Sequence, residues 1–540
     1  MAPTRKISAT EVAKHTSPNS CWVILHSNVY DVTPLLTTHP GGPTAILTHA
    51  GTDASAIFDS LHPSDTLSEL PPQCLLGPVD KSTLPSSALD RKPAPTSTLP
   101  ASSLPPLSHQ LNLDNFEKTA EKVLSEKAWA YYSSSANDGE TLRLNREIYR
   151  SILLRQRVFR DVSAVDTGTT LLGQRSSLPV FISPAAAARL AHPDGEAAIC
   201  RAAGKEGVIQ CVSNNASMTV EEISAARDTS SSIWGAGGQN LWWQLYLQVD
   251  RSKSAAFLHR ISQPSSGYTA VILTLDAPWP GKREADERAS LPPPELEMGG
   301  SAGAGVGKQL FAGTESSITW QDLEWVREHT HLPIILKGIQ THQDAAIAAR
   351  NPLVKGIMLS NHGGRALDTA PPAVLVLLEI RKHCPWVLQK IEVYVDGGIR
   401  RGADVVKCLA LGARAVGIGR PALYSLAGYG EEGVRRMLQI LRDEVETALR
   451  LVGVGGVEDV EGWKGWGEDG EGVWDHEKKK EGGMKVKVRE GVERIGEGST
   501  RNGEGVRGRV EYVNTRRVDS WIWEAEERSG GIIQRVSSKL

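Results

Sequence analysis

The chain has 540 residues, of which 40% are hydrophobic and 23% charged, and its formal net charge is −3 at pH 7. This length and composition are typical of a soluble globular protein with two or three domains. The near-neutral charge excludes the global basic field that attracts nucleic acid or an anionic membrane, and no apolar run reaches the roughly 18 residues that span a bilayer. We therefore expect neither nucleic acid nor a membrane as a partner.

Targeting signals are confined to the C-terminus. The N-terminal residues show neither a secretory apolar region nor a long Arg-rich presequence, and the six cysteines form no CxxC pair, which suits a reducing compartment. The chain closes with Ser538-Lys539-Leu540, the tripeptide that peroxisomal import receptors bind. The sequence therefore predicts a peroxisomal location, with the cytoplasm as the alternative.

Residues 1–78 form the first compositional block. His39 opens a His-Pro-Gly-Gly motif, His62 follows 23 residues later, and the segment between them has the pattern of two helices with an apolar face. Two imidazoles from separate loops can ligate a haem iron on both sides while apolar helices wall the macrocycle. The alternative is a glycine turn near an unrelated surface histidine.

Four further segments of this block resemble the cytochrome b5 family, a small α+β fold. The matching segments are Trp22-Val-Ile-Leu, Val29-Tyr-Asp-Val-Thr, Ala50-Gly-Thr-Asp-Ala-Ser and Phe58-Asp-Ser-Leu-His. The resemblance implies a haem b with His39 and His62 as its two axial ligands. Iron with both axial positions filled has no site for oxygen, so this domain is expected to move single electrons.

Residues 79–110 are rich in Pro and Ser and are expected to form a semi-extended tether. A helix is predicted over 115–134. From residue 179 onward, short apolar runs alternate with helix-like stretches. The runs are 180–182, 208–212, 242–246, 271–275, 333–336, 356–359, 393–395 and 415–418.

Eight such runs predict an α/β domain at 111–453 built as a (β/α)8 TIM barrel. A doubly wound open sheet also alternates, but it usually has fewer strands and a Gly-rich first turn, which is absent here. The Pro- and Gly-rich stretch 292–317 is too long for an ordinary connection and is expected to be a lid or mobile segment. Residues 454–540 are dense in Gly and charged residues, and are expected to be a disordered, low-complexity tail.

Chemistry in a barrel gathers at the C-terminal ends of its strands. Candidate groups follow all eight predicted strands: Pro184, Ala185 and Ala186; Ser213; Gln244 and Tyr246; Thr274 and Asp276; Lys337; Ser360, His362 and Arg365; Asp396, Gly397, Gly398 and Arg400; and Gly419 and Arg420. Any one of them could be a packing or capping residue, but a merely structural barrel does not need the whole series.

These groups favour FMN as the cofactor. Arg400 and Arg420 stand in or after Gly-rich turns that suit a phosphate. Lys337 offers a fixed positive charge to a reduced ring, and three polar side chains can bond to the ring's heteroatoms: Ser213, Gln244 and Thr274.

Several longer motifs resemble the FMN-dependent α-hydroxy acid dehydrogenase and oxidase family. They include Ala130-Tyr-Tyr-Ser-Ser-Ser-Ala-Asn-Asp, Gly281-Lys-Arg-Glu-Ala-Asp, Ser360-Asn-His-Gly-Gly-Arg and Asp396-Gly-Gly-Ile-Arg-Arg-Gly. With the haem block in front, the arrangement is similar to the flavocytochrome b2 group of cytochrome-type L-lactate dehydrogenases. The resemblance implies FMN, a small 2-hydroxy acid substrate, an external one-electron acceptor of the cytochrome c kind, and a homotetramer.

The resemblance also implies roles for individual side chains. His362 takes the proton during oxidation of the α carbon, and Asp276 orients its imidazole. Four side chains bind the substrate carboxylate and hydroxyl: Tyr131, Tyr246, Arg283 and Arg365. Whether electrons leave as a hydride or through a carbanion stays open.

The chain departs from the family pattern around the substrate. Ala185 replaces a customary Thr, Ala187 replaces a large apolar residue, and Asn215 stands where the family has an apolar or aromatic one; Ser135 replaces a Gly. Enlarging one wall at Ala187 and making another polar at Asn215 favours a larger or more polar 2-hydroxy acid than lactate.

Three functions are consistent with the sequence. The first is a dehydrogenase that passes electrons from FMN to the fused haem and then to an external acceptor. The second is an oxidase that passes electrons to O2 and makes hydrogen peroxide, which would suit a peroxisome. The third is a non-catalytic haem carrier with a decayed barrel, which the intact set of candidate residues argues against.

Overall fold

The computed structural model describes residues 6–39, 41–84, 104–291, 305–460 and 486–488. Most of the predicted tether, the first part of the predicted 292–317 lid, nearly all of the predicted tail and the C-terminal tripeptide therefore lie outside the described residues. Within the described ranges, no helix is long and apolar enough to cross a membrane.

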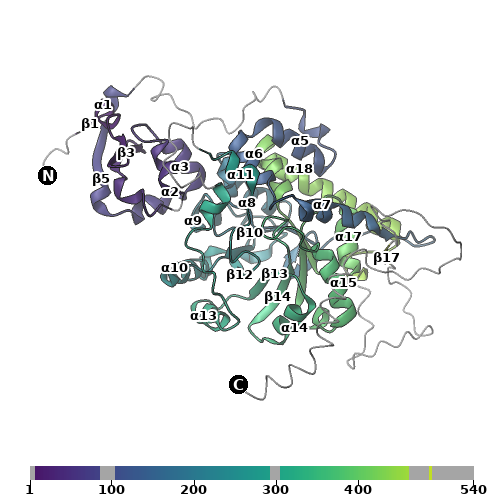
Figure 1. The fold of residues 1–540 in the computed structure, drawn as a ribbon. Helices are drawn as coiled ribbons and strands as arrows, with labels where there is room; N and C mark the ends of the chain where they lie inside the picture. The colour runs from purple at the N-terminus through teal and green to yellow at the C-terminus, as the bar shows by residue number, and fades with distance from the viewer. Residues whose placement is uncertain (1–5, 40, 85–103, 292–304, 461–485, 489–540) are drawn as a thin grey trace, which may run out of the picture.

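The N-terminal module is a small α+β domain, as predicted (Figure 1). Its five-stranded sheet has the order β1-β5-β4-β3-β2, in which only β1 and β5 pair in parallel. The strands are β1 (Ile7–Ser8), β2 (Thr16–Ser17), β3 (Ser20–Leu25), β4 (Asn28–Asp31) and β5 (Leu75–Asp80). Helices α1 (Ala9–Val12), α2 (Gly42–Leu47) and α3 (Ser55–Leu61) complete the module. We call residues 6–80 the haem module.

The central domain is a closed barrel of eight parallel strands, which confirms the predicted (β/α)8 fold. Its strands are β9 (Val180–Ile182), β10 (Ile209–Val212), β11 (Leu241–Leu245), β12 (Tyr268–Thr274), β13 (Ile334–Ile339), β14 (Val354–Leu359), β15 (Glu392–Asp396) and β16 (Ala415–Ile418). The last strand closes on the first, with Val416 opposite Val180. Almost every strand residue is buried, as expected for parallel strands covered by helices.

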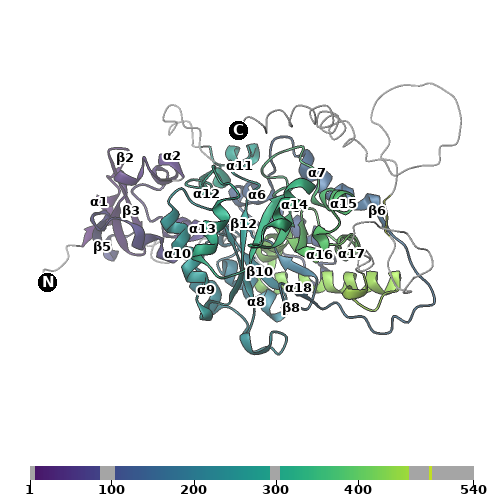
Figure 2. The same ribbon diagram turned by 90° about the horizontal axis from the view of Figure 1, so that it is seen from below.

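Helices surround the barrel on all sides (Figure 2). They are α5 (Leu113–Val123), α6 (Glu126–Ser133), α7 (Glu140–Glu147), α8 (Gly195–Lys205), α9 (Val220–Ala225), α10 (Arg251–Ile261), α11 (Glu284–Arg288), α12 (Val306–Leu310), α13 (Asp322–His329), α14 (His342–Arg350), α15 (Ala373–His383), α16 (Val387–Lys390), α17 (Gly402–Ala410) and α18 (Arg420–Val452). Three short strands, β6 (Ile152–Leu154), β7 (Thr169–Leu171) and β8 (Gln174–Ser176), lie outside the barrel, and β17 (Val486–Val488) pairs antiparallel with β6.

The single helix predicted over 115–134 is two helices, α5 and α6. Leu124 and Ser125 adopt extended backbone conformations between them, with ψ of 149° and 153°. The Ser125 hydroxyl then accepts a hydrogen bond from the Ala128 N–H at 3.2 Å and caps the new helix. The break matters because it aims the end of α6 at the top of the barrel.

The interior of the barrel explains why the candidate residues converge. Phe181, Trp242 and Tyr394 are fully buried and pack together, with ring centroids 5.2 to 5.6 Å apart. Since side chains alternate along a strand, the residues two positions further on also face inward, one layer higher. These include Ser183, together with Gln244 and Asp396, which the sequence analysis places at strand ends.

A close contact between α17 and α18 gives a test of the fold. A Cβ on Gly402 would lie 2.3 Å from the Val445 nitrogen. We expect Gly402→Ala to lower the free energy of unfolding by about 1–3 kcal/mol, because the two helices would have to separate. The control is Gly237→Ala, where a Cβ meets nothing within 4 Å. Chemical denaturation of both variants measures the difference; equal stability would contradict the packing.

Candidate active site and haem-binding site

An open cleft with about 1330 Å³ of empty space lies at the C-terminal ends of the barrel strands. Most of the residues predicted from the sequence line it. They are Tyr131, Pro184, Ala185, Ala186, Ser213, Asn215, Gln244, Tyr246, Thr274, Arg283, Lys337, His362, Arg365, Asp396, Gly397, Gly398, Arg400, Gly419 and Arg420. Asp276, Ser360 and Ala187 do not line the cleft.

Asp276 lies directly behind His362. Its carboxylate has no solvent exposure; one oxygen is 2.9 Å from His362 Nδ1 and the other accepts a hydrogen bond from Lys337 Nζ at 3.0 Å. Burial opposes the charge on Asp276, but Lys337 and His362 outweigh it and hold the pKa of this carboxyl well below its ordinary value. The carboxylate is therefore ionised at any physiological pH.

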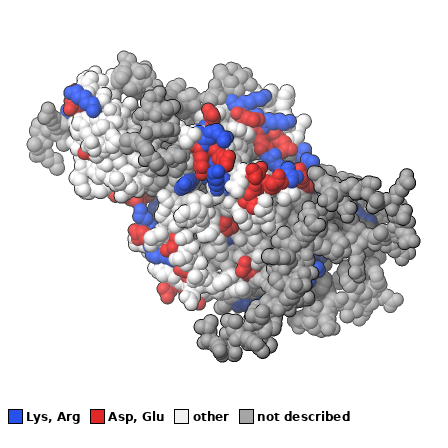
Figure 3. All heavy atoms as spheres, in the orientation of Figure 1, with Lys and Arg blue, Asp and Glu red and all other residues white. Residues whose placement is uncertain are grey.

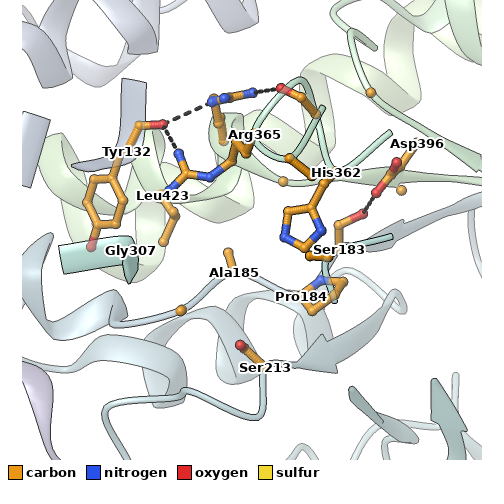
Figure 4. Close-up of a pocket in the computed structure, with 18 of the residues that line it drawn as sticks. Tyr132, Ser183, Pro184, Ala185, Ser213, Gly307, His362, Arg365, Asp396 and Leu423 are labelled. Atoms are coloured by element: carbon orange, nitrogen blue, oxygen red, sulfur yellow. Dashed lines mark hydrogen bonds between the residues drawn. The ribbon is translucent and has the colours of Figure 1, made fainter. Parts of the chain in front are cut away.

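His362 projects into the cleft toward Ser183 and Pro184 (Figure 4). Since Asp276 can only accept, the geometry assigns the proton of the neutral imidazole to Nδ1 and leaves the lone pair on Nε2. Nε2 faces the cleft, where the Tyr246 hydroxyl lies 3.4 Å away. This is the arrangement of a general base with an orienting carboxylate.

The loop that carries His362 needs its glycines. His362, Gly363 and Gly364 have φ of 57°, 63° and 77°, and a Cβ on Gly364 would lie 2.9 Å from the Leu142 nitrogen. Ser360, expected to bind the cofactor, is instead buried beneath this loop, and its hydroxyl accepts a hydrogen bond from the His362 N–H at 3.1 Å.

Two arginines flank Tyr131. The guanidinium carbons of Arg283 and Arg365 lie 5.4 and 5.0 Å from the centroid of its ring. Burial raises the pKa of the Tyr131 phenol to about 12, although Arg283 opposes the shift. Burial also raises the pKa of Tyr246 well above its ordinary value. Both phenols therefore remain protonated donors beside a positively charged wall that suits a carboxylate.

Arg365, which Figure 4 shows beside Tyr132, and Arg420 also hold the end of α6. Arg365 Nη1 donates to the carbonyls of Tyr131, Tyr132 and Ser134 at 2.8 to 3.2 Å. Arg420 Nε and Nη2 donate to the carbonyls of Tyr132 and Ser134, and its Nη1 donates to the Gly363 carbonyl in the His362 loop, all at 2.9 Å. The bonds to the α6 carbonyls are the ones that matter for the helix end. These bonds satisfy carbonyls that a helix end leaves without partners. The sequence indicated both arginines as site residues but not their hydrogen bonds to the end of α6. The phosphate-binding role of Arg420 stays a prediction.

The cleft suits FMN. Gln244 Oε1 accepts hydrogen bonds from Ser213 and Asn214 at 3.3 and 3.1 Å, while its Nε2 is buried without a partner in the described residues. Thr274 Oγ1 and Asp396 Oδ1 are also buried without partners there. Unsatisfied donors and acceptors of this kind are costly unless a polar ligand meets them, and a flavin ring carries both. Arg400 adds positive charge, although it also pairs with Glu117 at 3.1 Å.

Sequence reasoning missed the contribution of α12. Phe311, just after α12, lines the cleft with its ring centroid 5.1 Å from that of Tyr246 and 6.4 Å from that of His362. Asp286 connects this segment to the site, because it pairs with Arg283 at 3.3 Å and accepts from the Val306 and Gly307 N–H groups. The three-residue spacing between Arg283 and Asp286 on a helix was the available signal.

Of the two residues expected to set the substrate specificity, Asn215 lines the cleft and Ala187 does not. Ala187 is fully buried in a left-handed conformation, with φ of 53°, and its carbonyl accepts from the Tyr132 hydroxyl at 2.7 Å. It therefore does not form the enlarged pocket wall that we expected, and Ala186 lines the cleft instead. Asn215 does line the cleft, and its Nδ2 donates to the Leu310 carbonyl at 3.0 Å.

The haem module brings His39 and His62 together, with ring centroids 6.1 Å apart and ring planes inclined at 43°. Two imidazoles bonded to one iron from opposite sides have centroids about 6 Å apart. His62 Nδ1 lies 3.1 Å from the Phe58 carbonyl, which orients the other nitrogen for a metal. Burial lowers the pKa of both histidines and so favours the neutral imidazole, the form that can bind a metal.

The surroundings of the two histidines also suit a haem. Helices α2 and α3 contain no fully buried residue, and their apolar side chains are only partly covered: Ile46, Leu47, Ile57 and Phe58. A macrocycle between these helices would cover that apolar surface. Among the described residues, no group of three or more His, Cys, Asp or Glu side chains could hold a metal ion by itself.

Two family models match the chain. The model described as FMN-dependent dehydrogenase matches residues 120–463, and the model described as cytochrome b5-like heme/steroid binding domain matches residues 8–80. The L-lactate dehydrogenase (cytochrome) of Wickerhamomyces anomalus is 37% identical over 83% of this chain and 78% of its own length. The protein of the same name from Saccharomyces cerevisiae is 38% identical with the same coverage.

Solved structures agree with these matches. A mutant flavocytochrome b2 with benzoylformate has a TM-score of 0.58 and 37% identity, covering 66% of this chain and 87% of that one. A mandelate oxidase with (S)-4-hydroxymandelic acid has a TM-score of 0.60 and 32% identity, covering 70% of this chain and 99% of that one.

The predicted peroxisomal location is wrong. Two relatives that cover 83% of the chain are yeast cytochrome-type enzymes, which belong to the mitochondrial intermembrane space and not to peroxisomes. A relative named as peroxisomal, an (S)-2-hydroxyacid oxidase of Arabidopsis thaliana at 38% identity, covers 65% of this chain. A terminal tripeptide is short enough to arise without any relation to the fold, so it carried less weight than the two matched domains.

The buried carboxylate gives a prediction about the imidazole. We expect Asp276→Asn to slow reduction of the bound flavin by about 10² to 10⁴-fold, because His362 would lose the acceptor that fixes its tautomer. Stopped-flow absorbance of the flavin measures this rate. Asp322→Asn, which breaks a pair with Arg251 outside the cleft, is the control. A loss of less than threefold would contradict the role of Asp276.

The raised pKa of Tyr131 gives a prediction about pH. The phenol stays protonated below pH of about 12, so Tyr131→Phe should lower kcat/KM by about tenfold at every pH between about 6 and 10. The shape of the pH profile should not change. Disappearance of an inflection in that range would show that Tyr131 titrates there.

Proposed function

Because the chain belongs to the FMN-dependent dehydrogenase family and carries a cytochrome b5-like domain in front of its barrel, we propose that it oxidises an L-2-hydroxy acid to the 2-oxo acid. When bound, FMN takes up two electrons from the substrate, and haem b passes them singly to an external acceptor. The observation that supports this chemistry is the general base His362, held by the buried Asp276 at the end of a cleft whose polar groups suit FMN.

The side chains divide the work around the substrate's α carbon. His362 Nε2 accepts the proton that leaves during oxidation, and Asp276 stabilises the resulting imidazolium. Tyr246 lies beside Nε2 and holds the substrate hydroxyl. The charge of Arg283 and Arg365 around Tyr131 binds the carboxylate; the helix-end bonds of Arg365 all use Nη1, which leaves its other nitrogens for that carboxylate.

The haem module favours the dehydrogenase over the oxidase. His39 and His62 would hold a haem between them, and a haem held in this way would offer electrons an exit that does not require O2. The acceptor we propose is a cytochrome c-like protein. The alternative is an oxidase, since relatives that match mainly the barrel are named glycolate oxidase and 2-hydroxyacid oxidase. The intact cleft argues against a non-catalytic haem carrier.

The substrate we propose is larger or more polar than lactate. Asn215 supplies an amide and Phe311 supplies an aromatic face to the cleft. Two related proteins have structures with aromatic acids, benzoylformate and (S)-4-hydroxymandelic acid.

We also propose a homotetramer, and domain limits at 1–78, 79–110, 111–453 and 454–540.

An anaerobic titration tests the function. Without oxygen, we expect a panel of 2-hydroxy acids to bleach the flavin and then reduce the haem. In a parallel assay in air, we expect little peroxide. His39→Ala is expected to keep flavin bleaching and to lose haem reduction. An unbleached flavin with every acid would refute the enzyme. Stoichiometric peroxide with an oxidised haem would establish the oxidase.

Asn215 gives a prediction about specificity. We expect Asn215→Leu to raise kcat/KM for lactate relative to 4-hydroxymandelate by about tenfold, because an apolar wall suits the methyl group and removes the amide. The ratio within one variant controls for any general loss of activity. An unchanged ratio, or lactate as the best substrate of the parent enzyme, would contradict the assignment.

A further inference from the structure

The haem module meets the barrel through a short polar edge on the side of α9 and α10 (Figure 1). This edge belongs to a 3-10 helix, η2 (Ser64–Glu69), which begins two residues after the haem ligand His62. Three of its side chains contact the barrel: Ser64, Asp65 and Glu69. We call these three residues the docking edge.

Each residue of the docking edge has a partner of complementary chemistry on the barrel. The Ser64 hydroxyl donates to Glu222 at 3.2 Å, and Asp65 pairs with Arg260 at 3.1 Å. Glu69 lies 3.8 Å from Lys253 Nζ. Figure 3 shows side chains of both signs where the haem module meets the barrel.

The barrel side of this contact is preorganised. Arg260 uses Nε and Nη2 on the two oxygens of Glu221, and its guanidinium carbon lies 5.5 Å from the Phe257 ring centroid. Glu222 closes the capping box of α9 through its other oxygen, which accepts from the Thr219 N–H at 2.7 Å. These groups are already held by the barrel, so little side-chain freedom is lost when the haem module binds them.

An apolar contact lies on the other side of His62. Leu61 packs against the core of the barrel, and α3 contacts the 3-10 helix η8 (Ala188–Leu190). This helix directly follows the cleft-lining turn at Pro184–Ala186. Contacts on both sides of His62 therefore fix the haem ligand relative to the flavin cleft.

We propose that the docking edge is an electrostatic latch that sets the rate of electron transfer from flavin to haem. The proposal rests on the proposed function, because it assigns the contact a part in that electron path. Transfer between two cofactors slows steeply as they separate, and the latch keeps the haem ligand against the barrel. Arg260 and Asp65 are 30% and 43% exposed, so salt weakens their pair and the latch is reversible.

Cross-linking tests the contact without either cofactor. A carbodiimide forms an amide directly between a lysine and a carboxylate that touch, and Lys253 with Glu69 is such a pair. Mass spectrometry of the full chain should find this cross-link, with a yield that falls as salt rises and in Arg260→Glu. Its absence at low salt, or a yield that neither change lowers, would overturn the proposal.

Stopped-flow absorbance tests the consequence. At low salt, Arg260→Glu and Asp65→Arg should each slow haem reduction by about tenfold and leave flavin reduction unchanged. The double variant reverses the pair and should restore both haem reduction and the cross-link. Lys14→Glu, on the haem module but paired only with its neighbour Glu11 in the described contacts, is the charge-matched control. Failure of the double variant to restore either readout would overturn the latch.

The two proposals fail in different ways. If no 2-hydroxy acid reduces the flavin, the proposed function is wrong, and the cross-link still reports whether the docking edge binds. If the flavin is reduced and the haem follows at the same rate in every variant, the function stands and the latch is wrong.

Discussion

The buried charge on Asp276 is the constraint on which the active site depends. A carboxylate without solvent exposure is strongly destabilising unless opposite charge and hydrogen bonds compensate for lost hydration. Lys337 from β13 and His362 from the loop after β14 provide that compensation. The three groups therefore hold each other in place. The neighbouring backbone must be a glycine at position 338, because a Cβ there would lie 2.4 Å from the Asp276 Cβ.

The rest of the cleft is arranged around this charge set. The glycines after His362 let its ring turn into the cleft, and the end of α6 brings Tyr131 into the same cleft, where Arg283 and Arg365 lie against its ring. His362 and Arg365 thus come from one loop, whereas Tyr131 comes from α6 and Arg283 from the start of α11. The proposed exit for electrons lies on the same side of the barrel, because α3, which ends just before His62, contacts η8, the short helix that follows the cleft-lining turn.

Much of this could be predicted from the sequence, since alternation along a strand determines which side chains face the barrel interior. Gln244, Thr274 and Asp396 were predicted because they stand at the C-terminal ends of apolar runs, where the chemistry of a barrel gathers. The failure at Ala187 has a local cause: a left-handed residue turns the side chain away, and no propensity scale predicts it for alanine. The wall formed by Phe311 and the contact between Asp65 and Arg260 depend on distant segments meeting, which one sequence does not specify.

The central claim is that oxidation breaks the α C–H bond of the substrate while His362, oriented by Asp276, takes up the proton that is released, and that electrons then pass from flavin to haem. Substrate deuterated at the α carbon tests it directly in an anaerobic single turnover. The account predicts that deuterium slows flavin bleaching several-fold and that the haem is reduced only after the flavin. Flavin bleaching without an isotope effect, or haem reduction that precedes it, would contradict the account.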